Sequence, residues 1–416
     1  MSAESLPKLI NPNSWLGVAL QGSAPNETTL ISGPLVSPKG KKFPQTFPTR
    51  RSGPGILVVI DGGNGALKIS TLMAPNVDEP PRLLMRRVEV CYALARQVRT
   101  GAPVKTFTVN GGVPIRIGQP FVSGAQSIRT GSTAERMNTG FYRDIMFSAI
   151  ADTLHEAGYQ PDKDKPLPIY LGYIIPTDEF SNNAVIATTD DALKSLRGTE
   201  FVVQRSDRNG SHKWNILVEN TGFAPQTQGV FYALQRGIFA DVVLEGITRL
   251  KTLDIGFGHE QILTVEFDEG EMTTSGGVIG KGMILVAERL IELVDAKYGV
   301  VLNHAQAQYA IITNKIDVGQ IHEVPELVKQ ALDEVGEVIL QKADNDAFTD
   351  QLATLICSGG GTIKLEQAIH QRIKLAKRRD GTSLVLPAKV AAWANNLGGF
   401  ARISHEIMRV QPWKTK

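Results

Sequence analysis

The chain has 416 residues, of which 42% are hydrophobic and 21% are charged, as expected of a globular protein large enough to bury two cores. Its 44 Lys and Arg residues nearly balance its 42 Asp and Glu residues, which excludes a strong overall positive field for direct binding of nucleic acid. A partner or a local patch would have to provide any link to DNA. We find no apolar run typical of a secretion signal or a membrane span, so we expect no membrane insertion.

Cys91 and Cys357 are the only cysteines, which are too few for a disulfide framework. We therefore expect the protein to reside in a reducing cytoplasm. The seven histidines show no paired spacing typical of metal ligands. Residues 1–54 are rich in Pro, Ser, Gly, Asn and Thr and lack a periodic apolar face. This segment is predicted to be a flexible N-terminal extension, with a partner-binding arm as the alternative.

The first informative stretch is Val58–Lys68, which predicts an apolar strand ending in Asp61, a tight turn and a returning strand that carries Lys68. Small residues in such a turn let backbone N–H groups approach phosphate oxygens. Lys68 can neutralise phosphate charge, and Asp61 can hold a hydrated magnesium ion. An ordinary hairpin, with glycines that serve only the turn, is the alternative. The candidate phosphate-binding turn residues are Gly62, Gly63, Asn64, Gly65 and Ala66.

A helix is predicted near Val88–Arg99, in a locally basic region that favours either a solvated face or a filament contact. The basic residues are Arg82, Arg86, Arg87, Arg96, Arg99 and Lys105. Further along, the pattern predicts a helix over Ala134–Gly158, a buried strand over Leu167–Pro176 and a hairpin that turns at Asn209 and Gly210. Ala224–Ala233 is then predicted to open another helix, with Gln226 in its first turn, where helix capping is the ordinary role of a glutamine.

The hairpin pattern returns at Thr252–Val265, where Asp254 ends a strand and Gly256 and Gly258 align with the glycines of the first turn. This repetition indicates two similar domains that face one another across a nucleotide. A third motif, Leu355–Ile363, is an apolar strand that runs into a glycine cluster before a helix. A flat base and a ribose could lie against the backbone of Gly359, Gly360 and Gly361.

Between these motifs, Ser275–Gly282 reads as a loop before an amphipathic helix, and its Lys281 either contacts the ribose or base or merely lies at a capped helix start. Helices are predicted over Val328–Lys342 and Lys364–Arg379. Pro387–Phe400 contains a glycine pair, Gly398 and Gly399, that could allow a hinge to move.

The order of these three motifs resembles the actin-like ATPases, and the nearest branch is the ParM-type plasmid-segregation actins. Asp61 and Lys68 have the same spacing as the corresponding residues of actin, and Gln226 precedes Tyr232 and Ala233 as the actin glutamine precedes its Tyr-Ala pair. Phe257 departs from actin, which has an acid there. The resemblance implies an α/β fold of the actin-like, ribonuclease H-like duplicated type, with a nucleotide cleft between two domains.

The resemblance also implies a domain layout. Residues 1–54 would be the extension, 55–250 domain I, 251–386 domain II with a small subdomain at about 298–345, and 387–416 a hinge strand and helix that return to domain I.

By the same resemblance, the chain hydrolyses ATP or GTP with Mg²⁺. Gln226 orients the attacking water, and Asp61 and Asp254 act in catalysis and hold the metal mainly through water. The nucleotide contacts would be the first-turn residues, Lys68, Lys281, the glycine cluster and, from the second turn, Gly256, Phe257, Gly258 and His259. The expected partners are further copies of the chain in a filament and an adaptor protein bound to plasmid DNA. A small-molecule kinase and a non-polymerising cytoskeletal regulator are the alternatives.

Overall fold

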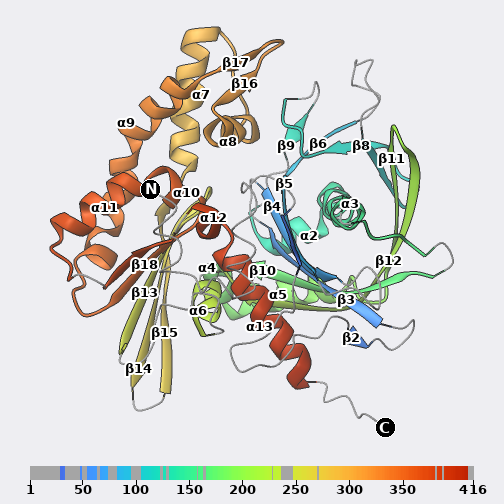
Figure 1. Cartoon of the computed structure of the whole chain (residues 1–416), viewed down its shortest axis with the longest axis horizontal. Coiled ribbons are helices and arrows are strands. Elements are labelled where there is room, and N and C mark those ends of the chain that lie inside the picture. Colours follow the sequence, from blue (N-terminus) through green and yellow to red (C-terminus); the bar gives the residue numbers. More distant parts are fainter. Residues whose placement is uncertain are drawn as a thin grey trace.

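Two β-sheets, each covered by helices, form the two halves of the molecule (Figure 1). The structure is a computed structural model. It describes residues 29–32, 47–48, 54–62, 66–73, 82–94, 105–121, 125–127, 131–156, 158–162, 165–226, 228–235, 247–268, 271–379, 382–386 and 388–410.

The sheet of the first half curls around helix α3 (Gly140–Glu156), whose buried side chains fill the concave side of the sheet (Figure 1). Strands β3 and β4 form the first predicted hairpin, and β3, β10 and β12 run parallel at the centre. The order of the strands is β1 (Thr29–Ser32), β5 (Arg82–Glu89), β4 (Ala66–Met73), β3 (Pro54–Gly62), β10 (Leu167–Ile175), β12 (Gly210–Pro225), β11 (Glu200–Asp207), β7 (Thr106–Val109), β8 (Ile115–Ile117), β6 (Cys91–Leu94) and β9 (Gln126–Ser127), with β2 (Phe47–Pro48) beside β3.

The predicted helix over Val88–Arg99 is wrong where the structure describes it, because residues 82–94 form β5 and β6. Along β6 buried and half-buried residues alternate, which is the period of a strand. Pairing with β8 and β9 satisfies the backbone of β6, and such tertiary contacts outweigh local propensity. Residues 95–99 lie outside the described residues.

Two described segments of the N-terminal extension are strands rather than featureless chain. Strand β1 pairs antiparallel with β5, and β2 pairs with β3. A short strand joins a sheet edge through its backbone hydrogen bonds, which need no apolar pattern in the sequence. The rest of residues 1–53 lies outside the described part of the chain.

The predicted helix over Ala134–Gly158 is present as two helices separated at Thr139: α2 (Thr133–Asn138) and α3. A capping box between Ser132 and Glu135 starts α2. Three further helices belong to this half: α4 (Thr177–Phe180), α5 (Asn183–Lys194) and α6 (Gln228–Gln235).

The second half contains the second predicted hairpin, β13 and β14, with β18 parallel to β13. Its sheet order is β15 (Glu271–Lys281), β14 (His259–Asp268), β13 (Arg249–Ile255), β18 (Thr354–Ser358) and β19 (Ser383–Val385). The helices and small strands of this half are α7 (Ile284–Tyr298), α8 (His304–Thr313), β16 (Lys315–Asp317), β17 (Ile321–Glu323), α9 (Pro325–Ala343) with a π-helical turn at Asp344–Phe348, α10 (Gly360–Lys364) and α11 (Glu366–Leu375).

The loop predicted over Ser275–Gly282 is mostly strand β15. Gly276 has a φ of +147°, and a Cβ atom there would lie 2.1 Å from the carbonyl oxygen of Ile262. The glycines of this segment therefore allow a close approach to β14 instead of marking a loop.

The expected hinge strand is also absent from the described C-terminal residues, which form helices α12 (Ala388–Ala391) and α13 (Ala394–Val410). Helix α13 does return to the first half, where it packs against β3, β4, β10 and β12. It shares one apolar cluster with α6 and with residues of both sheets, including Ile174, Val265 and Ile356. The two halves are thus joined through a common core beneath α13 (Figure 1).

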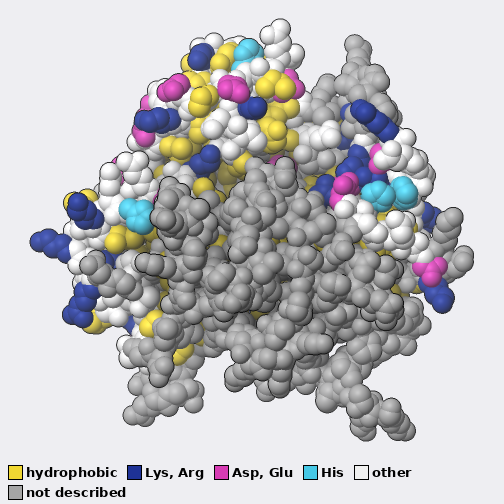
Figure 2. All heavy atoms as spheres, viewed as in Figure 1, with side chains coloured by type: hydrophobic (Ala, Val, Ile, Leu, Met, Phe, Trp, Pro, Cys, Tyr) yellow, Lys and Arg dark blue, Asp and Glu magenta, His cyan; other side chains and the backbone are white. Residues whose placement is uncertain are grey.

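No helix in the described part of the chain is both long enough and apolar enough to cross a bilayer. On the face seen in Figure 2, the described acidic and basic side chains lie intermixed over α7, α8 and α9. Ion pairs such as Arg289 with Glu334 and Lys329 with Asp333 balance the charge there.

Candidate functional site

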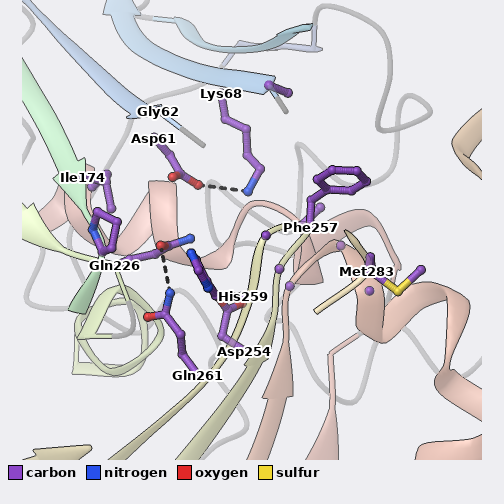
Figure 3. Close-up of a pocket in the computed structure, with 18 of the residues that line it drawn as sticks. Asp61, Gly62, Lys68, Ile174, Gln226, Asp254, Phe257, His259, Gln261 and Met283 are labelled. Carbon is purple, nitrogen blue, oxygen red and sulfur yellow. Dashed lines mark hydrogen bonds and ion pairs between the residues drawn. The ribbon is translucent and has the colours of Figure 1, made fainter. Parts of the chain in front are cut away.

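The two predicted hairpins line one cavity of about 350 Å³, which lies between the halves of the molecule and is in the size range of ligand sites (Figure 3). Most of the predicted site residues line it: Asp61, Gly62, Ala66, Lys68, Gln226, Asp254, Gly256, Phe257, Gly258, His259, Gly359, Gly360 and Gly361. Lys281 does not, and its Nζ lies 3.7 Å from Glu288 on the exposed start of α7. Gly63, Asn64 and Gly65 lie outside the described residues.

The first hairpin places an acid and a base side by side. Asp61 on β3 lies directly opposite Lys68 on β4, and the Lys68 Nζ is 2.9 Å from the Asp61 Oδ2 (Figure 3). Only 3% of Asp61 is exposed, so the ion pair is shielded from bulk water. The seven-residue spacing therefore joins the two charges across the hairpin.

Gly62 is required by packing behind the hairpin as well as by the turn. A Cβ atom at this position would lie 1.6 Å from the Tyr173 hydroxyl oxygen, which donates a 3.4 Å hydrogen bond to the Gly62 carbonyl. Tyr142 and Tyr173 share a 2.6 Å hydrogen bond, and burial raises the pKa of both phenols. The neutral tyrosine pair supports the first turn from behind.

The second turn is fixed by the start of α7. The N–H groups of Gly282, Met283 and Ile284 donate hydrogen bonds to the carbonyls of Gly258, Gly256 and Phe257, at 3.3, 3.0 and 2.6 Å. In a trans peptide the N–H points opposite to the C=O. The N–H groups of Phe257, Gly258 and His259 therefore point away from α7, and all three residues line the cavity.

Asp254 lies deeper in the opposite wall, with 2% of its surface exposed. The Ser358 hydroxyl donates a 3.3 Å hydrogen bond to its Oδ1, and a Cβ atom on Gly359 would lie 2.5 Å from the same oxygen. Burial raises the pKa of Asp254 to about 6, with a further contribution from the negative charge of Asp61 and an opposing one from Lys68. The two carboxylates therefore sense one another across the cavity.

Gln226 stands between the two walls, in the turn after β12. Its backbone N–H donates a 2.7 Å hydrogen bond to Ile175, and its side-chain oxygen lies 3.5 Å from the amide nitrogen of Gln261 (Figure 3). Gln226 precedes α6, which begins at Gln228, so it does not lie in the first turn of the helix. Its side-chain amide is held by a second amide from β14.

The glycine cluster and α8 both line the cavity. Gly359 has a φ of +94°, and Gly360 has no atom within 4 Å of a built Cβ, so the backbone is open at Gly360. Helix α8 contributes Gln308, Ile311 and Ile312 to the lining. Open backbone and apolar side chains in one cavity can hold a flat aromatic group.

Five charged residues of the cavity were not predicted as site residues: Arg87, Arg136, Asp178, Glu179 and Lys364. Glu179 accepts hydrogen bonds of 2.9 and 3.2 Å from the Thr133 backbone, and its Oε1 lies 3.9 Å from Arg136. Arg87 was interpreted as part of a basic solvated face. Arg87 lies opposite Lys68 on the neighbouring strand. If β5 had been recognised as a strand, this pairing would have predicted that the Arg87 side chain lies on the same face of the sheet as Lys68.

The donor set fits a magnesium ion bound mainly through water. Among the described residues, no cluster of three or more His, Cys, Asp or Glu side chains could hold a metal ion alone. Magnesium typically keeps several waters and takes one or two carboxylates together with substrate phosphates. Asp61 and Asp254 provide two such carboxylates. Burial, and to a smaller extent the charge of Asp61, raise the pKa of Asp254, and a bound cation would stabilise its ionised form.

A family model described as "Archaeal actin homologue MreB-like, C-terminal" matches residues 252–371. This range begins in β13 and includes the second hairpin and the glycine cluster. A comparison of the sequence with curated proteins gave no match.

Solved structures of actin homologues match almost over their full lengths. The archaeal actin homologue Ta0583 is 18% identical, with 84% of this chain and 99% of that chain covered and a TM-score of 0.56; it has also been solved in complex with ADP. The ParM of a 15-stranded filament from Clostridium botulinum is 15% identical, with 85% and 99% covered and a TM-score of 0.59. The actin-like protein Alp7A is 12% identical, with 87% and 100% covered and a TM-score of 0.58. The predicted actin-like two-domain fold is therefore confirmed.

Proposed function

We propose that this chain is a ParM-type actin-like nucleoside triphosphatase that binds ATP or GTP with Mg²⁺ and assembles into filaments. The observation that carries the proposal is the placement of Asp61 and Asp254. They come from two hairpins about 190 residues apart in the sequence, hold equivalent positions, and line opposite walls of one cavity. The solved complex of an archaeal actin homologue with ADP supports nucleotide as the ligand.

Backbone groups and side chains of the cavity bind different parts of the nucleotide and its metal ion. The N–H groups of the two turns hold the β- and γ-phosphates, and the base and ribose lie between the glycine cluster and α8. Asp61 and Asp254 hold Mg²⁺ mainly through water. When bound, the metal neutralises charge on the phosphate oxygens.

Gln226 orients the attacking water for in-line displacement, and the amide of Gln261 holds Gln226 in place. An amide can orient a water but is a poor proton acceptor. Turnover is therefore slow, which suits a nucleotide-dependent clock for assembly and disassembly better than metabolism. In the cell, such filaments push plasmid copies apart through an adaptor bound to the DNA.

The test combines light scattering with phosphate release after addition of Mg²⁺ and ATP or GTP. Gln226→Ala should slow phosphate release at least about tenfold, because the water loses its orientation, while the filaments form and then persist. Gln204→Ala changes an exposed glutamine on β11 far from the cavity and should behave as wild type.

Three results would contradict the proposal. ADP release that depends on an added sugar, without assembly, would indicate a small-molecule kinase. Nucleotide binding without either hydrolysis or assembly would indicate a regulator. Absence of any nucleotide binding would remove the basis of the assignment.

A further inference from the structure

Three charged residues form a row across neighbouring strands of the first sheet. Asp61 on β3 lies opposite Lys68 on β4, and Lys68 lies opposite Arg87 on β5. Residues directly opposite one another on paired strands project from the same face. All three line the cavity, whereas Arg86, the next residue in sequence, lies 2.5 Å from Asp152 on the other face of the sheet.

The ammonium group of Lys68 is already engaged by one carboxylate, because Asp61 lies 2.9 Å from it. Arg87 has more capacity. Its Nε donates a 3.3 Å hydrogen bond to Glu89, and its buried Nη2 has no hydrogen-bond partner. A guanidinium carries five N–H donors, so one carboxylate partner leaves most of them available.

The charge of the cavity creates a need for such a group. Its lining contains the cations Lys68, Arg87, Arg136 and Lys364 and the carboxylates Asp61, Asp178, Glu179 and Asp254. Without Arg87, three cations would face four carboxylates, and the cavity would carry a net negative charge that repels a polyphosphate. Arg136 is 2% exposed and lies beside Glu179, and Lys364 lies on α10 next to the glycine cluster.

We propose that Arg87 is a second cation for the polyphosphate chain of the nucleotide. It binds phosphate oxygens directly, while Lys68 mainly holds Asp61 in place. The planar guanidinium suits phosphate geometry better than an ammonium does. The inference rests on the proposed function, since it assumes that the cavity binds a nucleoside triphosphate.

The experiment measures affinities of wild type and Arg87→Gln for a nucleoside triphosphate and for its parent nucleoside, both with Mg²⁺. The triphosphate is whichever of ATP and GTP the wild type binds more tightly. Loss of a charge-assisted contact should weaken triphosphate binding about 10- to 100-fold and leave nucleoside binding unchanged. Arg87→Lys should restore part of the loss. Arg208→Gln removes an equal charge from an exposed turn and should change neither affinity.

The outcomes separate the inference from the proposed function. If the wild type binds no nucleotide, the proposed function fails. If it binds nucleotide and Arg87→Gln retains the wild-type preference for triphosphate over nucleoside, only the role of Arg87 is overturned. Equal weakening of both ligands would also overturn it, since that result indicates a structural role. Thermal unfolding of each variant shows whether it is folded. If Arg87→Gln is unfolded, the test uses Arg87→Lys, whose ratio of triphosphate to nucleoside affinity is compared with that of the wild type.

Discussion

Two acids on the second sheet, Asp254 and Glu260, are both buried but have different surroundings. Asp254 faces the cavity and has the Ser358 hydroxyl and the charge of Lys68 nearby. Glu260 is 0% exposed, and neither of its carboxylate oxygens has a hydrogen-bond partner. Burial raises the pKa of Glu260 to about 8, with Lys342 of α9 as the opposing charge. Glu260 is therefore mostly protonated at neutral pH.

This burial predicts a pH-dependent stability. An acid with a raised pKa in the folded state contributes most below its unfolded pKa of about 4.5, and that contribution is lost as pH rises toward 8. Glu260→Gln removes the titrating group. The free energy of unfolding of wild type should fall relative to that of the variant by roughly 2–4 kcal/mol between pH 5 and pH 8.5. Urea unfolding of both proteins at the two pH values measures this difference.

The comparison between the two proteins cancels other titrating groups, including Asp254, because they are present in both. A constant difference across this pH range would show that folding does not raise the pKa of Glu260, and would contradict the effect of its burial.

At the scale of elements, α13 and α6 approach one another through glycines. A Cβ atom on Gly398 would lie 1.6 Å from the carbonyl oxygen of Gly229, and one on Gly229 would lie 2.4 Å from that of Asn395. A Cβ atom on Gly399 would lie 1.9 Å from the side chain of Ile174 on β10. Gly398 and Gly399 were expected to allow a hinge strand to move, but in the helix Gly398 permits close contact between backbones and Gly399 permits close packing on a β10 side chain.

Gly398→Ala is accordingly expected to destabilise the protein by about 1–3 kcal/mol, because the added methyl group overlaps backbone that cannot move away easily. Gly140 of α3 is the matched control, since nothing lies within 4 Å of a Cβ atom there. Gly140→Ala should be neutral or slightly stabilising, as helix propensity favours alanine. Urea midpoints compare the two variants, and an equal effect at both positions would show that the α6–α13 contact tolerates the methyl group.

At the scale of the whole molecule, the two halves meet at two described places. One is the cluster under α13. At the other, Phe121 from the first half packs against the core of the second half, and its ring lies 5.4 Å from that of Tyr309 on α8, at an angle of 74°. This edge-to-face pair helps to keep the two halves together.

Loss of this pair should open the cleft more often. Phe121→Ala is expected to raise the dissociation rate of a bound nucleotide about 2- to 12-fold, as an aromatic pair contributes about 0.5–1.5 kcal/mol. Stopped-flow release of a fluorescent nucleotide measures this rate. Phe141→Ala removes a stacked ring, 4.4 Å from Tyr92, that lies wholly within the first half, and should leave release unchanged. Equal rates for wild type and Phe121→Ala would exclude a role for the pair in closure.

The sequence alone was sufficient to find the segments whose pattern involves only neighbouring residues. The two turns, the strand-end acids and the glycine cluster need small residues and carboxylates at short spacings. These spacings can be recognised in the sequence without knowledge of the tertiary structure. The predicted order of the three motifs was therefore enough to indicate the actin-like fold, which the structure confirms.

Partners distant in the sequence decided the rest. Residues 82–94 form strands because they pair with β4 and β8. This pairing places Arg87 beside Lys68, on the face of the sheet that lines the cavity. The C-terminal segment packs as a helix against α6, over 160 residues earlier in the chain, with glycines at the contact. The sequence by itself determined where the two glycine turns and their strand-end acids lie. The tertiary structure decided which charged side chains face the cavity, because direction across a sheet depends on register.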